Sequence, residues 1–359
     1  MVWAARHTRL IRASQVIVVI VGALVLVAAC TSSPQGPGTT STKGAIPTRS
    51  ATDAPSTTAP STTAPSTTAP ASTARPGKAG TYQVGERQLP PFDELTPTGD
   101  QRTLVIKIQY PLAQGSASQP ASGPFPLLLF APGFMYCGDT YEHLLDTWAS
   151  AGYVVAAVNF PYTDCQAGSA LNESDIVNQP ADMSYVLSRL LQLSTQSGNV
   201  LSGLLNPHEV AAAGHSDGGD TVAALAANTC CRDTRLKAVA VLSGAVAGFP
   251  GKYFSHGAPP MLFTQGSADK TNPPSASVTL YKADRANARY YFDLFGADHM
   301  APYAGTNPTE RLVARVTLAF FDRYVLGQTG ALTTMMTRYG NDSHTADLVD
   351  GSQLPPGAG

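Results

Sequence analysis

The residues best suited to chemistry lie in one short stretch, 214–218, which reads Gly-His-Ser-Asp-Gly. In the pattern Gly-x-Ser-x-Gly, the serine stands on a tight turn between a strand and a helix, where small neighbours avoid clashes. A serine hydroxyl is a weak nucleophile, so it needs a base to accept its proton and donors to stabilise the oxyanion that forms. An apolar run over 210–213 precedes the stretch and a second glycine follows it, so the context predicts strand, turn and helix. Ser216 is therefore the candidate nucleophile.

Two downstream loops could supply the acid and the base. In folds that carry this motif, the triad runs serine, acid, histidine along the chain. Asp269 follows a predicted strand over 260–265, and His299 follows a predicted strand over 288–294. Ligands bind at the carboxyl ends of parallel strands, so Asp269 there would orient His299 and stabilise its imidazolium.

Other acids and histidines must be weighed against this pair. Asp298 adjoins His299, and Asp293 lies within the preceding strand; both remain alternative acids. His215 adjoins the serine, but in such a turn its side chain points away, so we interpret it as a packing residue. Four other histidines are more simply explained as structural: His143, His208, His256 and His344.

The oxyanion would be held by two backbone N–H groups. One belongs to Asp217, the residue after the nucleophile, and the other to Phe134, which follows the predicted strand 125–131 and a Pro-Gly pair. The simpler interpretation of Pro-Gly is a plain β-turn. We expect the Asp217 carboxylate to point outward at the start of the helix, where negative charge suits the dipole. Apolar side chains of the nearby loops would line an acyl pocket: Phe134, Met135, Tyr136 and Tyr162.

Alternating strands and helices must position these residues. Apolar or alternating runs predict strands at 102–110, 125–131, 153–158, 209–213, 237–242, 260–265 and 288–294. Helical spacing predicts helices at 140–150, 175–193, 218–227, 274–287 and 310–325. This order predicts an α/β fold with a mostly parallel sheet and helices on both faces. The segment 243–260 is too short for a large lid domain.

The first eighty residues differ in composition from the rest. Residues 1–29 have a basic start and an apolar run over 16–29, too short for a comfortable membrane span. The run ends at Cys30 and resembles a bacterial lipobox, in which the cysteine is acylated after cleavage; an ordinary secretory signal with an incidental cysteine is the alternative. Residues 30–80, rich in Ser, Thr, Pro and Ala, predict a disordered tether. The folded domain is expected at 81–345 and a disordered tail at 346–359.

The chain has five cysteines, an odd number for an oxidising compartment. Assigning Cys30 to lipid leaves four that can pair. We favour Cys137 with Cys165, because both lie in loops after early strands, which leaves Cys230 with Cys231. The other pairings, or free buried thiols, remain open.

Charge and missing motifs exclude some functions. The 359 residues carry a formal net charge of −2, which argues against a nucleic-acid partner. No zinc-protease or dinucleotide motif occurs in its required context, so neither a metal nor a cofactor is expected. We expect a monomer.

Four segments carry a family resemblance: 131–134, 214–219, 266–269 with the prolines at 273–274, and 296–299. Over about 104–325 the chain resembles the dienelactone hydrolase-related α/β-hydrolases, and more narrowly chlorophyllases, platelet-activating-factor acetylhydrolases and cutinase-like polyester hydrolases. The resemblance implies the α/β-hydrolase fold, no cofactor, and carboxylic ester hydrolysis by Ser216, Asp269 and His299. The amides of Phe134 and Asp217 would form the oxyanion hole. Asp217 departs from the apolar or Gln residue common at its position, and a cysteine at 137 is not a general feature.

Together these features predict an exported, lipid-anchored serine esterase on the outer side of the cytoplasmic membrane. It would act on a small-molecule or lipid ester through an acyl-enzyme. The alternatives are an envelope acyltransferase on the same triad, a peptidase, and a catalytically inactive tethered binding lipoprotein.

Overall fold

The computed structural model describes residues 78–96, 99–286, 288–342, 344–351 and 353–354. The expected signal sequence, Cys30 and nearly all of the expected tether lie outside the described residues. Every structural statement below concerns these described residues, which all lie in the unit 67–359.

A mixed sheet forms the centre of this unit. Its strands are β1 (Val84–Gln88), β2 (Phe92–Leu95), β3 (Gln101–Pro111), β4 (Phe125–Ala131), β5 (Val154–Asn159), β6 (Leu205–His215), β7 (Leu236–Leu242), β8 (Met261–Gly266), β9 (Arg289–Leu294) and β10 (Ala346–Asp350). The order is β1-β3-β5-β4-β6-β7-β8-β9-β10, with β2 paired to β3. The strands from β5 through β9 are parallel. Antiparallel pairing is confined to the edges, at β1, β2 and β3 on one side and β10 on the other.

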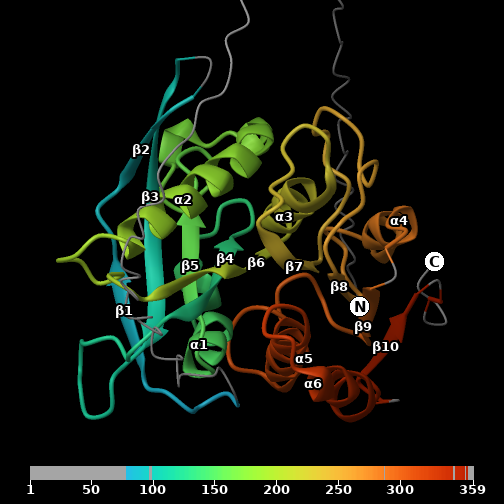
Figure 1. Cartoon of the computed structure of the whole chain (residues 1–359). Helices are drawn as coiled ribbons and strands as arrows, with labels where there is room; N and C mark the ends of the chain where they lie inside the picture. The colour runs from blue at the N-terminus through green and yellow to red at the C-terminus, as the bar shows by residue number, and fades with distance from the viewer. Residues whose placement is uncertain (1–77, 97–98, 287, 343, 352, 355–359) are drawn as a thin grey trace, which may run out of the picture. The chain divides into compact units, whose positions relative to one another are not determined.

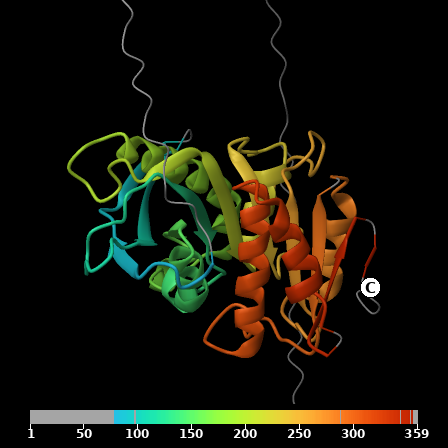
Figure 2. The same ribbon diagram turned by 60° about the horizontal axis from the view of Figure 1, so that its bottom comes forward.

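Helices cover both faces of the sheet. The α-helices are α1 (Glu142–Ser150), α2 (Gln179–Ser194), α3 (Asp217–Ala227), α4 (Pro274–Ala283), α5 (Pro308–Tyr324) and α6 (Thr329–Thr333). Shorter helical turns are η1 (Gly138–Tyr141), η2 (Gly168–Ala170), η3 (Glu173–Asn178) and η4 (Thr334–Tyr339). Helices α2, α3 and α4 share one apolar core with the sheet, while α1 and α5 share the other (Figures 1 and 2). Among the described residues, no helix is both long and apolar enough to cross a bilayer.

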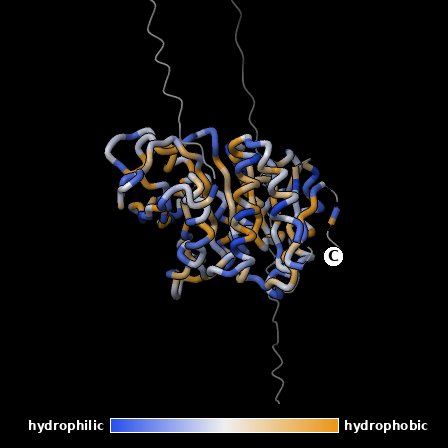
Figure 3. The backbone as a smooth tube through the Cα atoms, turned by 90° about the horizontal axis from the view of Figure 1, so that it is seen from below, coloured by the Kyte–Doolittle hydropathy of each residue, from blue (hydrophilic) through white to orange (hydrophobic). Residues whose placement is uncertain are grey.

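The parallel strands are largely apolar because both of their faces are covered, although β8 and β9 also bury polar residues. Every residue of β4, β5, β8 and β9 is buried. Figure 3 shows hydrophobic segments of the chain mainly in the interior and hydrophilic segments mainly toward the outside. Helix starts follow local chemistry: α2, α4 and α5 each have proline in the first turn, where the missing N–H costs nothing.

The α/β architecture predicted from the sequence, a mostly parallel sheet with helices on both faces, is confirmed. Three differences have local causes. Strands β1 and β2 were not expected, because they are largely polar and form by pairing with β3. The predicted helix 175–193 begins as the 3-10 turn η3 and becomes α-helical only at Gln179. The expected tail 346–359 is wrong for residues 346–350, which form β10 against β9.

Candidate active site

Ser216 lies on the sharp turn between β6 and α3, as the motif predicts. Its backbone has φ 54° and ψ −123°, a strained conformation for a residue with a side chain. Its N–H donates to the Leu242 carbonyl at 2.9 Å, which ties the turn to the end of β7. A Cβ on Gly218 would lie 1.9 Å from the Ala131 carbonyl oxygen, and one on Gly214 would lie 2.1 Å from the Gly218 oxygen. The two motif glycines are therefore required by the close approach of β4, β6 and α3.

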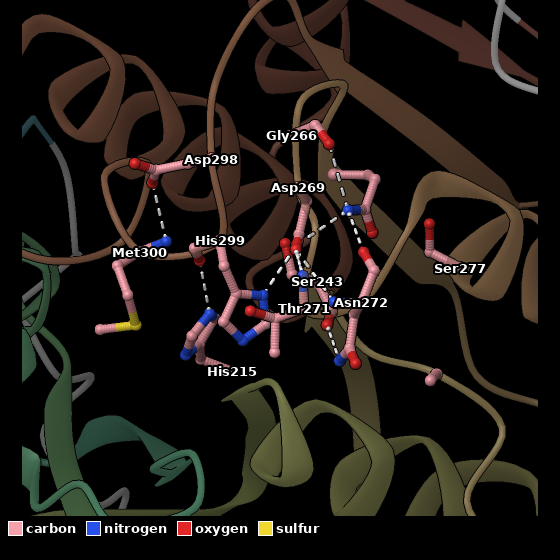
Figure 4. Close-up of polar contacts among 12 residues, drawn as sticks. His215, Ser243, Gly266, Asp269, Thr271, Asn272, Ser277, Asp298, His299 and Met300 are labelled. Atoms are coloured by element: carbon pink, nitrogen blue, oxygen red, sulfur yellow. Dashed lines mark hydrogen bonds and ion pairs between the residues drawn. The ribbon is translucent and has the colours of Figure 1, made fainter. Parts of the chain in front are cut away.

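Asp269 and His299 meet at the same edge of the sheet. Asp269 Oδ2 lies 2.7 Å from His299 Nδ1. Asp269 Oδ1 accepts the N–H groups of Thr271 and Asn272, each at 2.9 Å. Oδ2 also accepts a side-chain N–H of Gln265 at 3.1 Å. Figure 4 shows His299, Thr271 and Asn272 around the Asp269 carboxylate, which together with Gln265 has four donors.

These donors decide the charge of the acid. Burial alone would raise the pKa of Asp269, but the hydrogen bond and charge of His299 and the N–H groups of Asn272 and Thr271 outweigh it, so the pKa falls below its ordinary value. Asp269 is therefore ionised at neutral pH and can hold the His299 ring.

The two alternative acids lie in other environments. Asp298 accepts the N–H groups of Met300 and Ala301 at 3.0 and 2.8 Å, so it caps its own turn. Asp293 is buried in β9, and burial, with the nearby charge of Asp347, raises its pKa to about 6. In the described part of the chain neither carboxylate hydrogen-bonds His299, which favours Asp269 as the acid.

His215 is buried, as its interpretation as a packing residue requires, but it also bridges two parts of the site. Burial, together with the charge of His299, lowers the pKa of His215 to about 3, so the ring is neutral. Its Nδ1 lies 2.9 Å from the Tyr141 hydroxyl, which itself accepts the Gly133 N–H at 3.2 Å. The Tyr141 hydroxyl therefore donates to Nδ1, and Nε2–H donates to the His299 carbonyl at 2.9 Å. His215 thus connects the loop after β4 with the main chain of His299.

The loop after β4 lies against the serine. A Cβ on Gly133 would lie 3.2 Å from Ser216 Cβ. In the part of the chain that the structure describes, the N–H groups of Phe134 and Asp217 donate no hydrogen bond. The next residue, Met135, has φ 67° and donates its N–H to the Thr163 carbonyl at 2.8 Å. Two unpaired backbone donors are thus available from the segments that flank Ser216.

The Asp217 side chain does not point outward as expected. Its Oδ2 is buried and has no hydrogen-bond partner among the described groups. Burial raises the pKa of Asp217 to about 6, and the nearby charge of Glu173 adds to this, while His299 opposes it. The dipole argument considered only the start of α3, whereas η3, which carries Glu173, packs against that helix. Local reasoning could not foresee this cover.

The expected acyl-pocket residues are more exposed than a closed pocket requires. Met135 is 56% exposed, Tyr136 36% and Tyr162 37%, while Phe134 is partly buried. They follow β4 and β5, at the carboxyl ends of the parallel strands. Two other exposed apolar residues also follow parallel strands, Val246 after β7 and Phe295 after β9. We call these five exposed residues the apolar rim.

Two disulfides join the four described cysteines, in the favoured pairing. Cys137 bonds Cys165, with a Cα–Cα distance of 5.3 Å, and ties the loop after β4 to the loop after β5. Cys230 bonds its neighbour Cys231 just after α3. The first bond therefore braces the loop that carries the Phe134 N–H.

Several groups at this site escaped the sequence analysis. Gln265 and Asn272 contact Asp269 from nearby in the chain, and Tyr141 reaches His215 through tertiary structure, but no motif marks any of the three. No group of three or more His, Cys, Asp or Glu side chains in the described residues is arranged to hold a metal ion.

Comparison with known proteins supports the architecture. Residues 107–271 match the family model described as Chlorophyllase. The match runs from β3 to the loop after β8, so it includes Ser216 and Asp269, and His299 lies beyond it. No curated protein sequence matches the chain. The chain is thus similar over this range to a family of the α/β-hydrolase type, which indicates a hydrolase that acts on esters.

Proposed function

We propose that this protein is a serine hydrolase that cleaves carboxylic esters with Ser216, His299 and Asp269. The observation that carries the proposal is the 2.7 Å contact between His299 Nδ1 and Asp269 Oδ2 beside a strained serine turn. His215 adjoins Ser216 in the chain and hydrogen-bonds the His299 backbone, which holds the histidine next to that turn. A nucleophile, a base and an orienting acid are the minimum for this chemistry.

The mechanism follows from the roles of these groups. His299 accepts the Ser216 proton as the hydroxyl attacks the ester carbonyl, and ionised Asp269 stabilises the imidazolium. The N–H groups of Phe134 and Asp217 donate to the oxyanion. His299 then protonates the departing alcohol, leaving an acyl-enzyme, and water attacks that ester by the same route.

The substrate is proposed to be a small-molecule or lipid ester with an apolar acyl group. The apolar rim supports this choice, since several large apolar side chains are exposed at the edge of the sheet that carries Ser216. Single exposed apolar residues are ordinary, but a group around one site indicates apolar contact. The preference for an apolar acyl group is measured with p-nitrophenyl esters of increasing acyl length. A kcat/KM that does not depend on acyl length would contradict this preference.

Replacing the nucleophile tests the reaction. Ser216→Ala should abolish hydrolysis of p-nitrophenyl acetate and labelling by a fluorophosphonate probe, whereas Ser202→Ala, an exposed serine away from the site, should change neither. Retained turnover in Ser216→Ala would refute the assignment, and wild-type protein that is not labelled would indicate an inactive binding protein. Ser216-dependent transfer to an added alcohol in preference to water would identify an acyltransferase.

We further propose that the protein is exported and anchored to a membrane through Cys30. The sequence pattern supports the anchor, and two disulfides suit an oxidising compartment. Cys30→Ser should move the protein from the membrane fraction to the soluble fraction; unchanged fractionation would contradict the anchor.

A further inference from the structure

We propose that Gln265 is a positioning residue whose side-chain amide holds the Asp269 carboxylate in the orientation that His299 requires. The inference rests on the proposed function, because it assigns a role toward the proposed acid. Gln265 is a fully buried polar residue in β8, a strand otherwise rich in apolar side chains. Burying an amide in such a place is costly unless it is hydrogen-bonded.

The surroundings of Gln265 determine which way its amide faces. Nε2 lies 3.1 Å from Asp269 Oδ2, 3.2 Å from the Gly266 carbonyl and 3.0 Å from the Asn272 carbonyl. All three neighbours are acceptors, so the amide oxygen in that position would meet only repulsion. The opposite atom, Oε1, is buried without a hydrogen-bond partner among the described groups. The orientation is therefore kept although it leaves one acceptor unpaired.

The contact with Asp269 places Gln265 next to the proposed chemistry. Asp269 Oδ2, which accepts from Gln265, is the same oxygen that lies 2.7 Å from His299 Nδ1. The other oxygen is occupied by the N–H groups of Thr271 and Asn272. With four donors in place, the carboxylate cannot rotate without losing hydrogen bonds (Figure 4).

Gln265 also differs from the other donors in its origin. The N–H groups of Thr271 and Asn272 belong to the loop that carries Asp269 and move with it. Gln265 lies on β8, which is paired on both sides, with β7 and β9. It is therefore the donor that fixes the carboxylate relative to the sheet rather than to its own loop.

A purely structural role predicts different behaviour from a positioning role. The contacts with Gly266 and Asn272 carbonyls would stabilise the loop whatever Asp269 does. Removing the donor from Asp269 Oδ2 leaves more negative charge facing His299, which favours the imidazolium. The acidic limb of the kcat/KM profile then moves to higher pH, because the base is active only when neutral. A loss of loop stability alone would leave the acidic limb of the kcat/KM profile at the same pH.

The test compares Gln265→Met with Gln109→Met, using p-nitrophenyl acetate. Gln109 is also buried, and its Nε2 donates to Asp146 at 2.8 Å, far along the chain from the site. We expect Gln265→Met to lower kcat about tenfold, with KM changed less than about twofold. Its acidic limb should move up by roughly half a pH unit. Gln109→Met should leave kcat, KM and the limb as in the wild type.

Two outcomes overturn the proposal. One is an unchanged kcat and profile in Gln265→Met. The other is a lower kcat that accompanies a lower Tm with no movement of the acidic limb. If Gln265→Met does not fold, Gln265→Asn carries the test, because it keeps an amide but is one methylene too short for Asp269. If only the role of Gln265 is wrong, Ser216→Ala is still inactive. If the proposed function is wrong, Ser216→Ala keeps its activity.

Discussion

Two aspartates of the site, Asp269 and Asp217, lie in different environments. Asp269 has four hydrogen-bond donors and a lowered pKa. Asp217 has a buried oxygen without a hydrogen-bond partner among the described groups, and burial and the charge of Glu173 raise its pKa to about 6. Burial pushes both pKa values upward, so burial does not separate them. The number of hydrogen-bond donors separates the two pKa values, and it determines which carboxylate stays ionised at acid pH.

The largest effect is expected when the charge of Asp269, the carboxylate with four donors, is removed. Asp269→Asn should lower kcat by roughly three to four orders of magnitude, because an amide no longer stabilises the imidazolium and can favour the wrong His299 tautomer. Steady-state hydrolysis of p-nitrophenyl acetate measures it. Asp298→Asn, which changes the neighbouring carboxylate that caps its own turn, should have a far smaller effect. Equal losses in the two variants would show that Asp269 is not the acid.

A second test concerns the Tyr141 hydroxyl, which holds the loop beside Ser216. Tyr141→Phe removes the acceptor of the Gly133 N–H and the donor to His215, so the loop that carries the Phe134 N–H loses an anchor. We expect kcat to fall about tenfold. The control is Tyr153→Phe, which removes another buried hydroxyl, one that donates to Asp322. It should lower Tm without lowering kcat, and a similar kcat loss in both would contradict a specific role.

The smallest expected effect is on folding stability and comes from Asp217, the carboxylate whose buried oxygen has no donor among the described groups. The pKa of Asp217 is raised to about 6, so the folded state binds a proton that the unfolded state releases at lower pH. Folding stability therefore falls as pH rises toward and through 6, and the penalty is complete above it. Asp217→Asn should raise the free energy of unfolding by about 1 kcal/mol at pH 8, a value reduced for solvent screening, and by almost nothing at pH 4.

Urea unfolding at the two pH values measures the difference. Glu173→Gln should give a smaller gain of the same sign at pH 8, because the Glu173 charge is a lesser cause of the shift than burial. A loss of stability in Asp217→Asn at pH 8 would show that the carboxylate has a partner after all.

Segments with their own apolar signal could be predicted from the sequence. Strand β4 occupies the predicted residues 125–131, and β8 begins and ends one residue later than predicted, because both are continuous buried runs. Strand β1 could not be predicted, because its sequence Val-Gly-Glu-Arg-Gln is mostly polar and becomes a strand only by pairing with β3.

The same division holds at the site. Asp269 and His299 follow strands and could be placed by chain order, and the structure brings them together. Gln265 could not be identified, because its role depends on acceptors contributed by a loop that folds back over β8. The raised pKa of Asp217 depends likewise in part on Glu173 of η3, which is distant in the sequence but packs against α3.

Strand β10 has a practical consequence for handling the protein. It covers the free edge of β9, and an uncovered edge strand is a template for pairing with other chains. Aspartates at both 347 and 350 make the new edge poorly suited to such pairing. A shortened chain ending near 345 would expose β9, the strand that leads to His299, so aggregation during expression would be the expected symptom.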